Sequence, residues 1–420
     1  MTNPWFQLVA SVIAMVMIAN LQYAWTLFTG PLQEASKSLV PGGWKLADIQ
    51  LAFTIFINFQ TFVQPVDGWF IDKMGPRLFI TVAGVLCGVG WAAMGFATSL
   101  TQLYIFYAIA GVGAAFVYSG CIGSALKWFP DRRGMASGII AAGFGGGTAL
   151  FIPIIQYLIN NQSYGSAFLV TGIIQGSVIA ILAQFLRHPA PGSVSAQPAK
   201  STSKASTRKN QEQFTTVEML KTPHFYLIYV IFLAAATGGL FLTANVGALT
   251  RFWQLAAILT ISTTVSPLAN GASRISWGWI SDRVGREKTM AIAFALEGVC
   301  LLAVLFIGQT SGLFFTITVA LTFFTWGEVY SLFPSTVGDY FGSRNATSNY
   351  GVVYTAKGVG TILGAYIAAR MFQAYGNWDM VFYGCAGLAF AAAVGALILR
   401  RVPLPRRAVT AEAATVTAAH

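Results

Sequence analysis

The sequence predicts an all-α integral membrane protein with twelve transmembrane helices, arranged as two pseudo-symmetric six-helix bundles. Three observations carry this prediction. Apolar side chains make up 55% of the 420 residues and charged ones only 9%, whereas a soluble domain carries about 25% charged residues. Apolar runs long enough to cross a bilayer, which takes roughly 20 residues each, recur along the whole chain. Short motifs in the first half of the chain also recur in the second half.

The apolar runs give the expected helices in order. We expect them near residues 5–33, 46–71, 78–98, 102–127, 134–160, 165–187, 223–250, 254–281, 289–308, 312–338, 345–374 and 378–400. The runs do not alternate apolar and polar residues, which excludes the strands of a β-barrel. The first run has no basic residue before Lys37, so we expect a retained helix rather than a cleaved signal peptide.

One long polar break divides these helices into six and six. The segment from His188 to Thr222 is rich in Pro, Ser, Ala and Lys, a composition typical of a disordered linker. We therefore expect an N-terminal bundle at 1–187, a cytoplasmic linker at 188–222, a C-terminal bundle at 223–401 and a cytoplasmic tail at 402–420.

The basic residues predict the orientation in the membrane. Of the 25 Lys and Arg residues, 19 fall in the linker, the tail and the loops on the same side, which indicates that this side and both termini are cytoplasmic. The net charge of +11 is thereby explained without nucleic acid, which we exclude as a partner. The four cysteines lie in separate apolar runs, which excludes closely spaced zinc or redox motifs, so we expect no metal and no cofactor.

Two motifs recur at offsets of 210 and 211 residues. The sequence Arg133 to Ser137 matches Arg344 to Ser348, and the G-x-x-x-D-[RK]-x-G motif occurs in two loops, each time with a following basic residue. Its residues are Gly68, Asp72, Lys73, Gly75 and Arg77 in the first copy, and Gly278, Asp282, Arg283, Gly285 and Arg286 in the second. This motif is the loop signature of the major facilitator superfamily, whose bundles are parallel repeats. We expect Asp72 and Asp282 to pair with nearby cations as a conformational latch between the halves, and the glycines to allow close helix approach.

Two basic residues lie deep inside predicted helices. Arg274 lies eight residues before Asp282, and therefore roughly 12 Å along a helix that rises 1.5 Å per residue, while Lys357 lies roughly 20 Å beyond Arg344. Each costs about 2.5–3.5 kcal/mol on insertion scales and marks a functional site by default. The alternative is a buried salt bridge with Glu297 or Glu328. Arg370, near a helix end, is expected to reach the interface as an anchor.

Four segments resemble the bacterial oxalate/formate antiporters. They read LQYAWTLF, NGASRISWGWISD, FFTWGEVYSLFPS and NYGVVYTAKG, and the similarity covers the chain apart from the linker and tail. The resemblance implies a major facilitator fold in a bacterial inner membrane, with Arg274 and Lys357 binding the carboxylates of oxalate. It implies a pocket lined by Gln22, Tyr23, Gln50, Tyr118, Trp326, Tyr330 and Tyr354. The chain departs from the family pattern at Phe144, Tyr354 and Glu328, where Tyr, Trp and Gly are expected.

The predicted function is exchange of small carboxylate anions by alternating access, with oxalate and formate as the expected substrates and a monomer as the working unit. Two buried cations oppose passage of an empty site through a dry state, whereas a dianion cancels them. The alternative is a proton-coupled monocarboxylate symporter with Glu328 or Glu297 as the proton site. A membrane-embedded enzyme is disfavoured, because the helices contain no HExxH or GxSxG motif.

Overall fold

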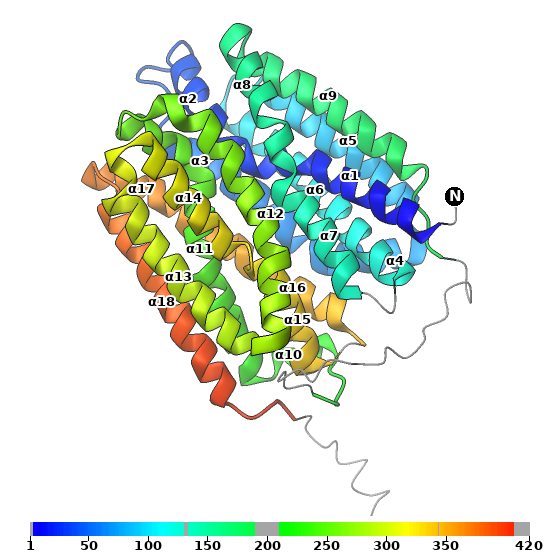
Figure 1. Cartoon of the computed structure of the whole chain (residues 1–420). Helices are drawn as coiled ribbons and strands as arrows, with labels where there is room; N and C mark the ends of the chain where they lie inside the picture. Colours follow the sequence, from blue (N-terminus) through cyan, green and yellow to red (C-terminus); the bar gives the residue numbers. More distant parts are fainter. Residues whose placement is uncertain (1–2, 130–132, 190–209, 343, 407–420) are drawn as a thin grey trace, which may run out of the picture.

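The computed structural model describes residues 3–129, 133–189, 210–342 and 344–406, and within these ranges it leaves undescribed the side chains at 68, 69, 72–74, 126, 133, 134, 137 and 347. Every regular element in the described ranges is a helix, as the sequence predicts. The helices form two bundles that stand side by side, one coloured blue through cyan to blue-green and the other green through yellow to red (Figure 1).

The first bundle contains the elements up to α9. In chain order they are α1 (Pro4–Tyr23), α2 (Trp25–Ser36), α3 (Leu46–Phe62), α4 (Gln64–Met74), α5 (Pro76–Met94), α6 (Leu100–Trp128), α7 (Arg133–Gly146), η1 (Gly147–Leu150), α8 (Ile152–Asn161) and α9 (Tyr164–Ala183). Helix α5 packs against α6 and α9, and α1 packs against α6 and α7.

The second bundle begins at α11. Its elements are α11 (Pro223–Phe252), η2 (Ala256–Ile258), α12 (Leu259–Val284), α13 (Arg286–Phe306), η3 (Gly308–Thr310), α14 (Gly312–Trp326), α15 (Val329–Phe341), α16 (Ala346–Thr361), η4 (Ile362–Ile367), α17 (Ala368–Tyr375) and α18 (Asp379–Arg401). Helix α13 packs against α14 and α18, and α11 packs against α16 and α18.

The contacts between the bundles follow the sequence repeat. Helix α3, in the second predicted span, packs on α16, in the eleventh. Helix α7, in the fifth span, packs on α12, in the eighth, and α2 packs on α11. Because spans two and five of one half meet spans eleven and eight of the other, the bundles are related by a pseudo-twofold arrangement, as expected for a parallel repeat.

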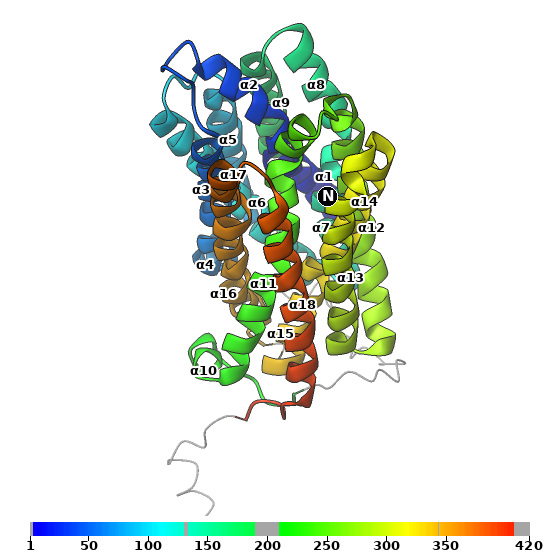
Figure 2. The ribbon, with the colours of Figure 1, turned by 90° about the vertical axis from the view of Figure 1, so that its left-hand side faces the viewer.

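The two ends of the molecule differ in what they carry. Short helix α10 (Thr216–Leu220) lies at one end, whereas α2 and α8 lie at the other (Figure 2). We call these the linker end and the α2 end. The loops at Gly75 and Gly285 belong to the linker end, and the last turn of α11, at Arg251, belongs to the α2 end.

Eleven segments within the described residues are long and apolar enough to cross a membrane. The remaining predicted span corresponds to α12, a helix of 26 residues. Its composition explains the difference, because Ser262, Ser266, Asn270, Ser273 and Arg274 form a buried polar face. The chain is a multi-pass membrane protein.

Large apolar side chains cover the outer surface of the spans. They include Val85 and Val89 on α5, Leu313 and Ile317 on α14, and Val394 and Leu397 on α18. In a membrane protein such a surface faces the acyl chains, so the polar side chains are left for the interior.

Several segments that the sequence predicts as single helices are broken. The first span changes direction at Ala24, between α1 and α2, and the second at Val63, between α3 and α4. Pro65 follows the second break in the first helical turn, where its missing N–H is tolerated. The fifth span contains a 3-10 turn, η1, and the eleventh contains a π turn, η4. Such irregular turns inside long helices are frequent at functional sites.

The last part of the predicted linker has an ordered conformation that its composition did not suggest. The Asn210 backbone N–H donates to the Asp339 carbonyl at 2.8 Å, and the Phe214 N–H donates to the Phe341 carbonyl at 2.9 Å. Helix α10 follows, with Thr215 and Glu218 forming a capping box. This segment therefore joins the end of α15.

Candidate functional site

Arg274 of α12 lies at the boundary between the two bundles, with only 2% of its surface exposed. Its Nη1 donates to the Ala141 carbonyl of α7 at 2.9 Å, and its Nη2 donates to the Tyr23 hydroxyl at 3.3 Å. Within α12, Nη2 and Nε donate to Asn270 Oδ1 at 3.1 and 3.3 Å. The guanidinium is therefore fixed by hydrogen bonds to uncharged groups of both halves.

Lys357 of α16 is fully buried at the same boundary. Its Nζ donates to Gln22 Oε1 of α1 and to Gln60 Oε1 of α3, both at 2.8 Å, and to the Tyr354 hydroxyl at 3.2 Å. The two amides come from the first half and the tyrosine from the second. All three partners are again uncharged.

Aromatic rings connect the two cations. Cζ of Arg274 lies 4.7 Å from the centroid of the Tyr330 ring, and Lys357 Nζ lies 5.6 Å from it. Both cations also lie 5.8 Å from the centroid of Phe144. Cations are attracted to ring faces at such distances. Because both cations lie near the same two rings, their positive charges repel one another in this buried site, and the uncharged rings compensate them only in part.

The remaining rings enclose this centre. Tyr118 stacks on Tyr354 at 5.6 Å between centroids, and Trp326 meets Tyr330 edge to face at 5.3 Å. Trp326 fits because residue 239 is glycine: a Cβ there would lie 1.9 Å from Trp326 Cδ2. Of the predicted lining residues, the structure therefore brings together Gln22, Tyr23, Tyr118, Trp326, Tyr330 and Tyr354 around Arg274 and Lys357.

Gln50 lies apart from the predicted site. Its Nε2 donates to the Ala244 carbonyl at 2.7 Å and to Asn245 Oδ1 at 3.2 Å, and its Oε1 accepts from Trp25 Nε1 at 3.0 Å. None of these hydrogen bonds reaches a cation. Gln50 instead joins α3 of the first half to α11 of the second.

Neither buried cation forms a salt bridge within the described residues. Glu328 and Glu297 are both fully buried, and the carboxyl oxygens of Glu328 contact no hydrogen-bond donor among the described groups. Glu328 therefore forms no salt bridge with Arg274 or Lys357, contrary to the alternative expectation. Glu328 lies at the junction of α14 and α15.

The site is closed at both ends. Toward the α2 end, the Gly247 backbone N–H donates to Thr26 Oγ1 at 2.6 Å. A small cavity of about 10 Å³ beside this contact is lined in part by Tyr23, Thr26 and Phe323. Toward the linker end, α16 packs on α4 of the first half, and a Cβ at Gly351 would lie 3.5 Å from Pro65 Cα. The burial of both cations follows from this double closure.

The second copy of the repeated motif forms ion pairs within its own half. Arg286 Nη1 lies 2.8 Å from Asp282 Oδ1, and Nε lies 3.3 Å from Asp339 Oδ2 at the end of α15. Arg283 instead lies over the Trp279 ring, at 3.5 Å from its centroid. These contacts tie α12, α13 and α15 together, and the expected latch between the halves stays a prediction.

The first copy of the motif is described only in part. Arg77 Nε donates to Gln184 Oε1 at 2.9 Å, again within one half. The side chains of Asp72 and Lys73, and the surroundings of Gly68, lie outside the described part of the chain. The expected ion pair of Asp72 therefore stays a prediction.

The motif glycines have a conformational role that differs from the one expected. Gly75 and Gly285 have φ angles of +84° and +99°, a region that strongly favours glycine. No neighbouring heavy atom would lie within 4 Å of a Cβ at Gly75 or Gly278. Close helix approach therefore does not explain glycine at these two positions.

The sequence analysis did not predict two partners of Arg274, Asn270 and the Ala141 carbonyl. It also did not predict the contacts that Phe144 and Gln60 make with the cations. Asn270 precedes Arg274 by one helical turn, a spacing at which side chains meet, and this signal was available. The Ala141 carbonyl carries no signal in the sequence. Phe144 was noted only as a departure from a pattern, although it contacts both cations. Gln60 accepts from Lys357, but it is one of several amides in the second predicted span, and nothing in the sequence marks it as that partner.

Comparison with known proteins places this geometry in context. The sequence profile of the Major Facilitator Superfamily matches residues 6–259 and 253–419. The chain is similar to the oxalate:formate antiporter of Oxalobacter formigenes, with 36% identity over 405 residues that cover 96% of this chain and 93% of the relative. It is 26% identical to the uncharacterized MFS-type transporter YhjX of Escherichia coli over 371 residues, 85% of this chain and 86% of that one. It is also 26% identical to monocarboxylate transporter 13 of Rattus norvegicus over 353 residues, 82% of this chain and 78% of that one.

Proposed function

This chain belongs to the major facilitator superfamily of membrane transporters, and from that premise we propose that it exchanges oxalate for formate by alternating access. The chain is a transporter and not an enzyme. The observation that carries the proposal is the pair of buried cations, Arg274 and Lys357, whose hydrogen-bond partners are all uncharged.

Charge balance supports a dicarboxylate as one substrate. Burying a charge without a counter-ion is costly, and the site holds two positive groups enclosed by both halves. Oxalate supplies two negative charges and two planar carboxylates, and a guanidinium binds such a group through two parallel hydrogen bonds. Similarity to the oxalate:formate antiporter over nearly the full length of both chains favours the same pair of substrates.

The same balance favours exchange over one-way transport. With the site empty, the two cations repel one another during closure, and this opposes return of the empty carrier. A bound anion removes the opposition, so the loaded carrier crosses faster. Formate brings one negative charge and oxalate two, so each exchange cycle moves one net charge.

The test is uptake of labelled oxalate into proteoliposomes that contain the purified protein. Vesicles loaded with formate should take up oxalate faster than empty vesicles, and the rate should respond to an imposed membrane potential. Vesicles loaded with chloride at the same ionic strength are the matched control. Equal uptake by formate-loaded and chloride-loaded vesicles would contradict exchange.

A second candidate function is proton-coupled symport of a monocarboxylate. The observation that favours it is the burial of two carboxyl groups, Glu297 and Glu328, the second without a hydrogen-bond donor among the described groups, because buried carboxyl groups of this kind are suited to bind and release a proton. Symport predicts that uptake acidifies the vesicle interior and stops in Glu328→Gln. Antiport predicts that the exchange rate in Glu328→Gln stays close to that of the unmodified protein.

We further propose that the linker end faces the cytoplasm of a bacterium, with the protein in the inner membrane as a monomer. Arg283, Arg286, Arg400 and Arg401 all lie at helix ends on this side, which is the distribution expected of cytoplasmic loops. Exposed positions for cysteine labelling are Ser38 at the α2 end and Lys288 at the linker end. In intact cells an impermeant thiol reagent should label Ser38→Cys and not Lys288→Cys.

A further inference from the structure

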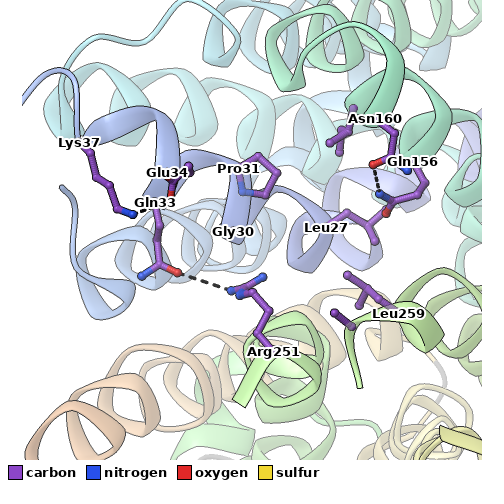
Figure 3. Close-up of a pocket in the computed structure, with 12 residues that line it drawn as sticks. Leu27, Gly30, Pro31, Gln33, Glu34, Lys37, Gln156, Asn160, Arg251 and Leu259 are labelled. Carbon is purple, nitrogen blue, oxygen red and sulfur yellow. Dashed lines mark hydrogen bonds and ion pairs between the residues drawn. The ribbon is translucent and has the colours of Figure 1, made fainter. Parts of the chain in front are cut away.

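A cavity of about 530 Å³ lies between the halves at the α2 end. Its lining includes Gly30, Gln33, Glu34, Lys37, Gln156 and Arg251 (Figure 3). The side chains of Glu34 and Lys37 are 75% and 58% exposed, so the cavity opens toward solvent at this end. It is separated from Arg274 by the closed contacts between α2 and α11.

Arg251 joins the two halves across this cavity. It stands in the last turn of α11 and donates through Nη2 to Thr29 Oγ1 at 3.2 Å and to Gln33 Oε1 at 3.5 Å, both on α2. The guanidinium packs against the α2 backbone at Gly30, where a Cβ would lie 2.6 Å from Nη1. Figure 3 shows the side chain reaching from the second half toward α2.

The charge of Arg251 has no counter-ion among the described residues. Glu34 is the acidic residue in the lining of the cavity, and its Oε2 is paired with Lys37 Nζ at 2.6 Å. The partners of Arg251 are a hydroxyl and an amide. Arg251 is therefore the uncompensated cation of this cavity, and a guanidinium in a partly buried position has a strong preference for a carboxylate.

The contacts of Arg251 are the outermost of a series that α11 makes with α2 and α3 of the first half. Thr26, Thr29 and Gln33 follow one another at intervals of three and four on α2, and Ala244, Gly247 and Arg251 do so on α11, so each set lies on one helix face. Thr26 accepts from the Gly247 N–H at 2.6 Å, and the Ala244 carbonyl accepts from Gln50 at 2.7 Å. Opening of the α2 end must separate these contacts, and those of Arg251 lie nearest to solvent.

We propose that Arg251 is a second anion site, which captures the carboxylate substrate at the α2 end and couples its arrival to opening. The proposal rests on the proposed function. Hydrogen bonds between a guanidinium and a carboxylate are roughly twice as strong as those between neutral groups. A carboxylate in the cavity therefore replaces Thr29 and Gln33 as partner of Arg251, and this releases the outermost contacts between the halves.

The test compares three variants in transport measured from each side of the membrane. Arg251→Gln removes the charge, Arg251→Lys keeps it without the planar fork, and Lys37→Gln is the matched control, because it removes the other cation of the same cavity. Initial rates of exchange are measured with whichever anion of a panel of mono- and dicarboxylates the unmodified protein transports. Right-side-out and inside-out vesicles give a KM for each end.

Capture by Arg251 predicts that Arg251→Gln raises KM about tenfold at the α2 end, the loss expected for one charged hydrogen-bonding contact, and leaves KM at the linker end unchanged. Arg251→Lys should have an intermediate KM, and Lys37→Gln should resemble the unmodified protein. A merely structural Arg251 would give the opposite sign, because loss of its contacts to α2 favours opening and lowers KM at that end. Higher ionic strength should reduce the difference.

Three results would overturn the proposal: an equal KM change at both ends, a lowered KM in Arg251→Gln, or an equal effect of Lys37→Gln. These differ from failure of the proposed function, which would appear in the unmodified protein. If that protein exchanges other carboxylates but not oxalate, the substrate assignment is wrong and Arg251 is still tested. If it transports no carboxylate in the panel, the proposed function is wrong, and capture of a carboxylate at Arg251 is wrong with it.

Discussion

Lys357 of the second half donates from Nζ to Oε1 of Gln22 in the first half at 2.8 Å, with both side chains fully buried. This hydrogen bond joins the two halves at a charge that has no counter-ion among the described residues. The contact belongs to a closed state in which the charges of Lys357 and Arg274 are balanced only by a bound anion. Several consequences of this can be measured.

Replacement of Lys357 should reduce transport of dianions more than transport of monoanions. Lys357→Gln leaves a site with a single cation, Arg274, which still balances formate but not oxalate. We expect oxalate transport to fall by about tenfold or more, the effect of one charged interaction, and formate self-exchange to fall much less. Arg370→Gln, which removes an exposed cation from α17, is the control and should affect neither anion. An equal loss for both anions would assign Lys357 a structural role.

Arg274→Lys tests whether shape as well as charge is required. Arg274 contacts Ala141, Tyr23 and Asn270 at once, and a lysine ammonium lacks the planar fork that makes this geometry possible. In a thermal-shift assay, oxalate at 100 times its Kd should stabilise the unmodified protein by about 2.7 kcal/mol. The variant should show little shift at the same concentration. A full shift in Arg274→Lys would show that the guanidinium geometry is not needed.

The ion pairs of Arg286 predict unequal effects of two similar substitutions. Asp339 is 13% exposed and Asp282 is 63% exposed, and both pair with Arg286. Exposed pairs contribute about 0–1 kcal/mol, so Asp282→Asn should lower the midpoint of thermal unfolding very little. Asp339→Asn should lower it more, with KM for the substrate unchanged. A large change in KM with no change in unfolding would show that the cluster acts on substrate binding.

Gly239→Ala should destabilise the second half. The added Cβ would overlap the Trp326 ring, whose Cδ2 would lie 1.9 Å away, and overpacking of a tight core costs roughly 1–3 kcal/mol. The matched control is Gly384→Ala in α18, where no neighbouring heavy atom would lie within 4 Å of the Cβ. Thermal unfolding in detergent compares the two. Similar midpoints would contradict the packing of Trp326 described above.

The sequence predicted the all-helical fold, the two bundles and the burial of Arg274 and Lys357, because apolar runs and buried charges are properties of single segments. It did not predict the break at Ala24, since the residues there are compatible with a continuous helix, whereas Pro65 is a signal in the sequence for the break at Val63. Gln50 and Gln60 illustrate the same limit. Both are amides of one helix, and only the packing of α3 against the second half decides that Gln60 meets Lys357 while Gln50 meets Ala244.

Both buried cations belong to the second half, since Arg274 is on α12 and Lys357 is on α16. The first half contributes only neutral partners to them, namely Gln22, Tyr23, Gln60 and a backbone carbonyl. When the halves rock against each other, we therefore expect the anion to remain bound to the cations of the second half. Because these partners in the first half are neutral, the membrane voltage acts on the site through the two cations of the second half and the anion they hold.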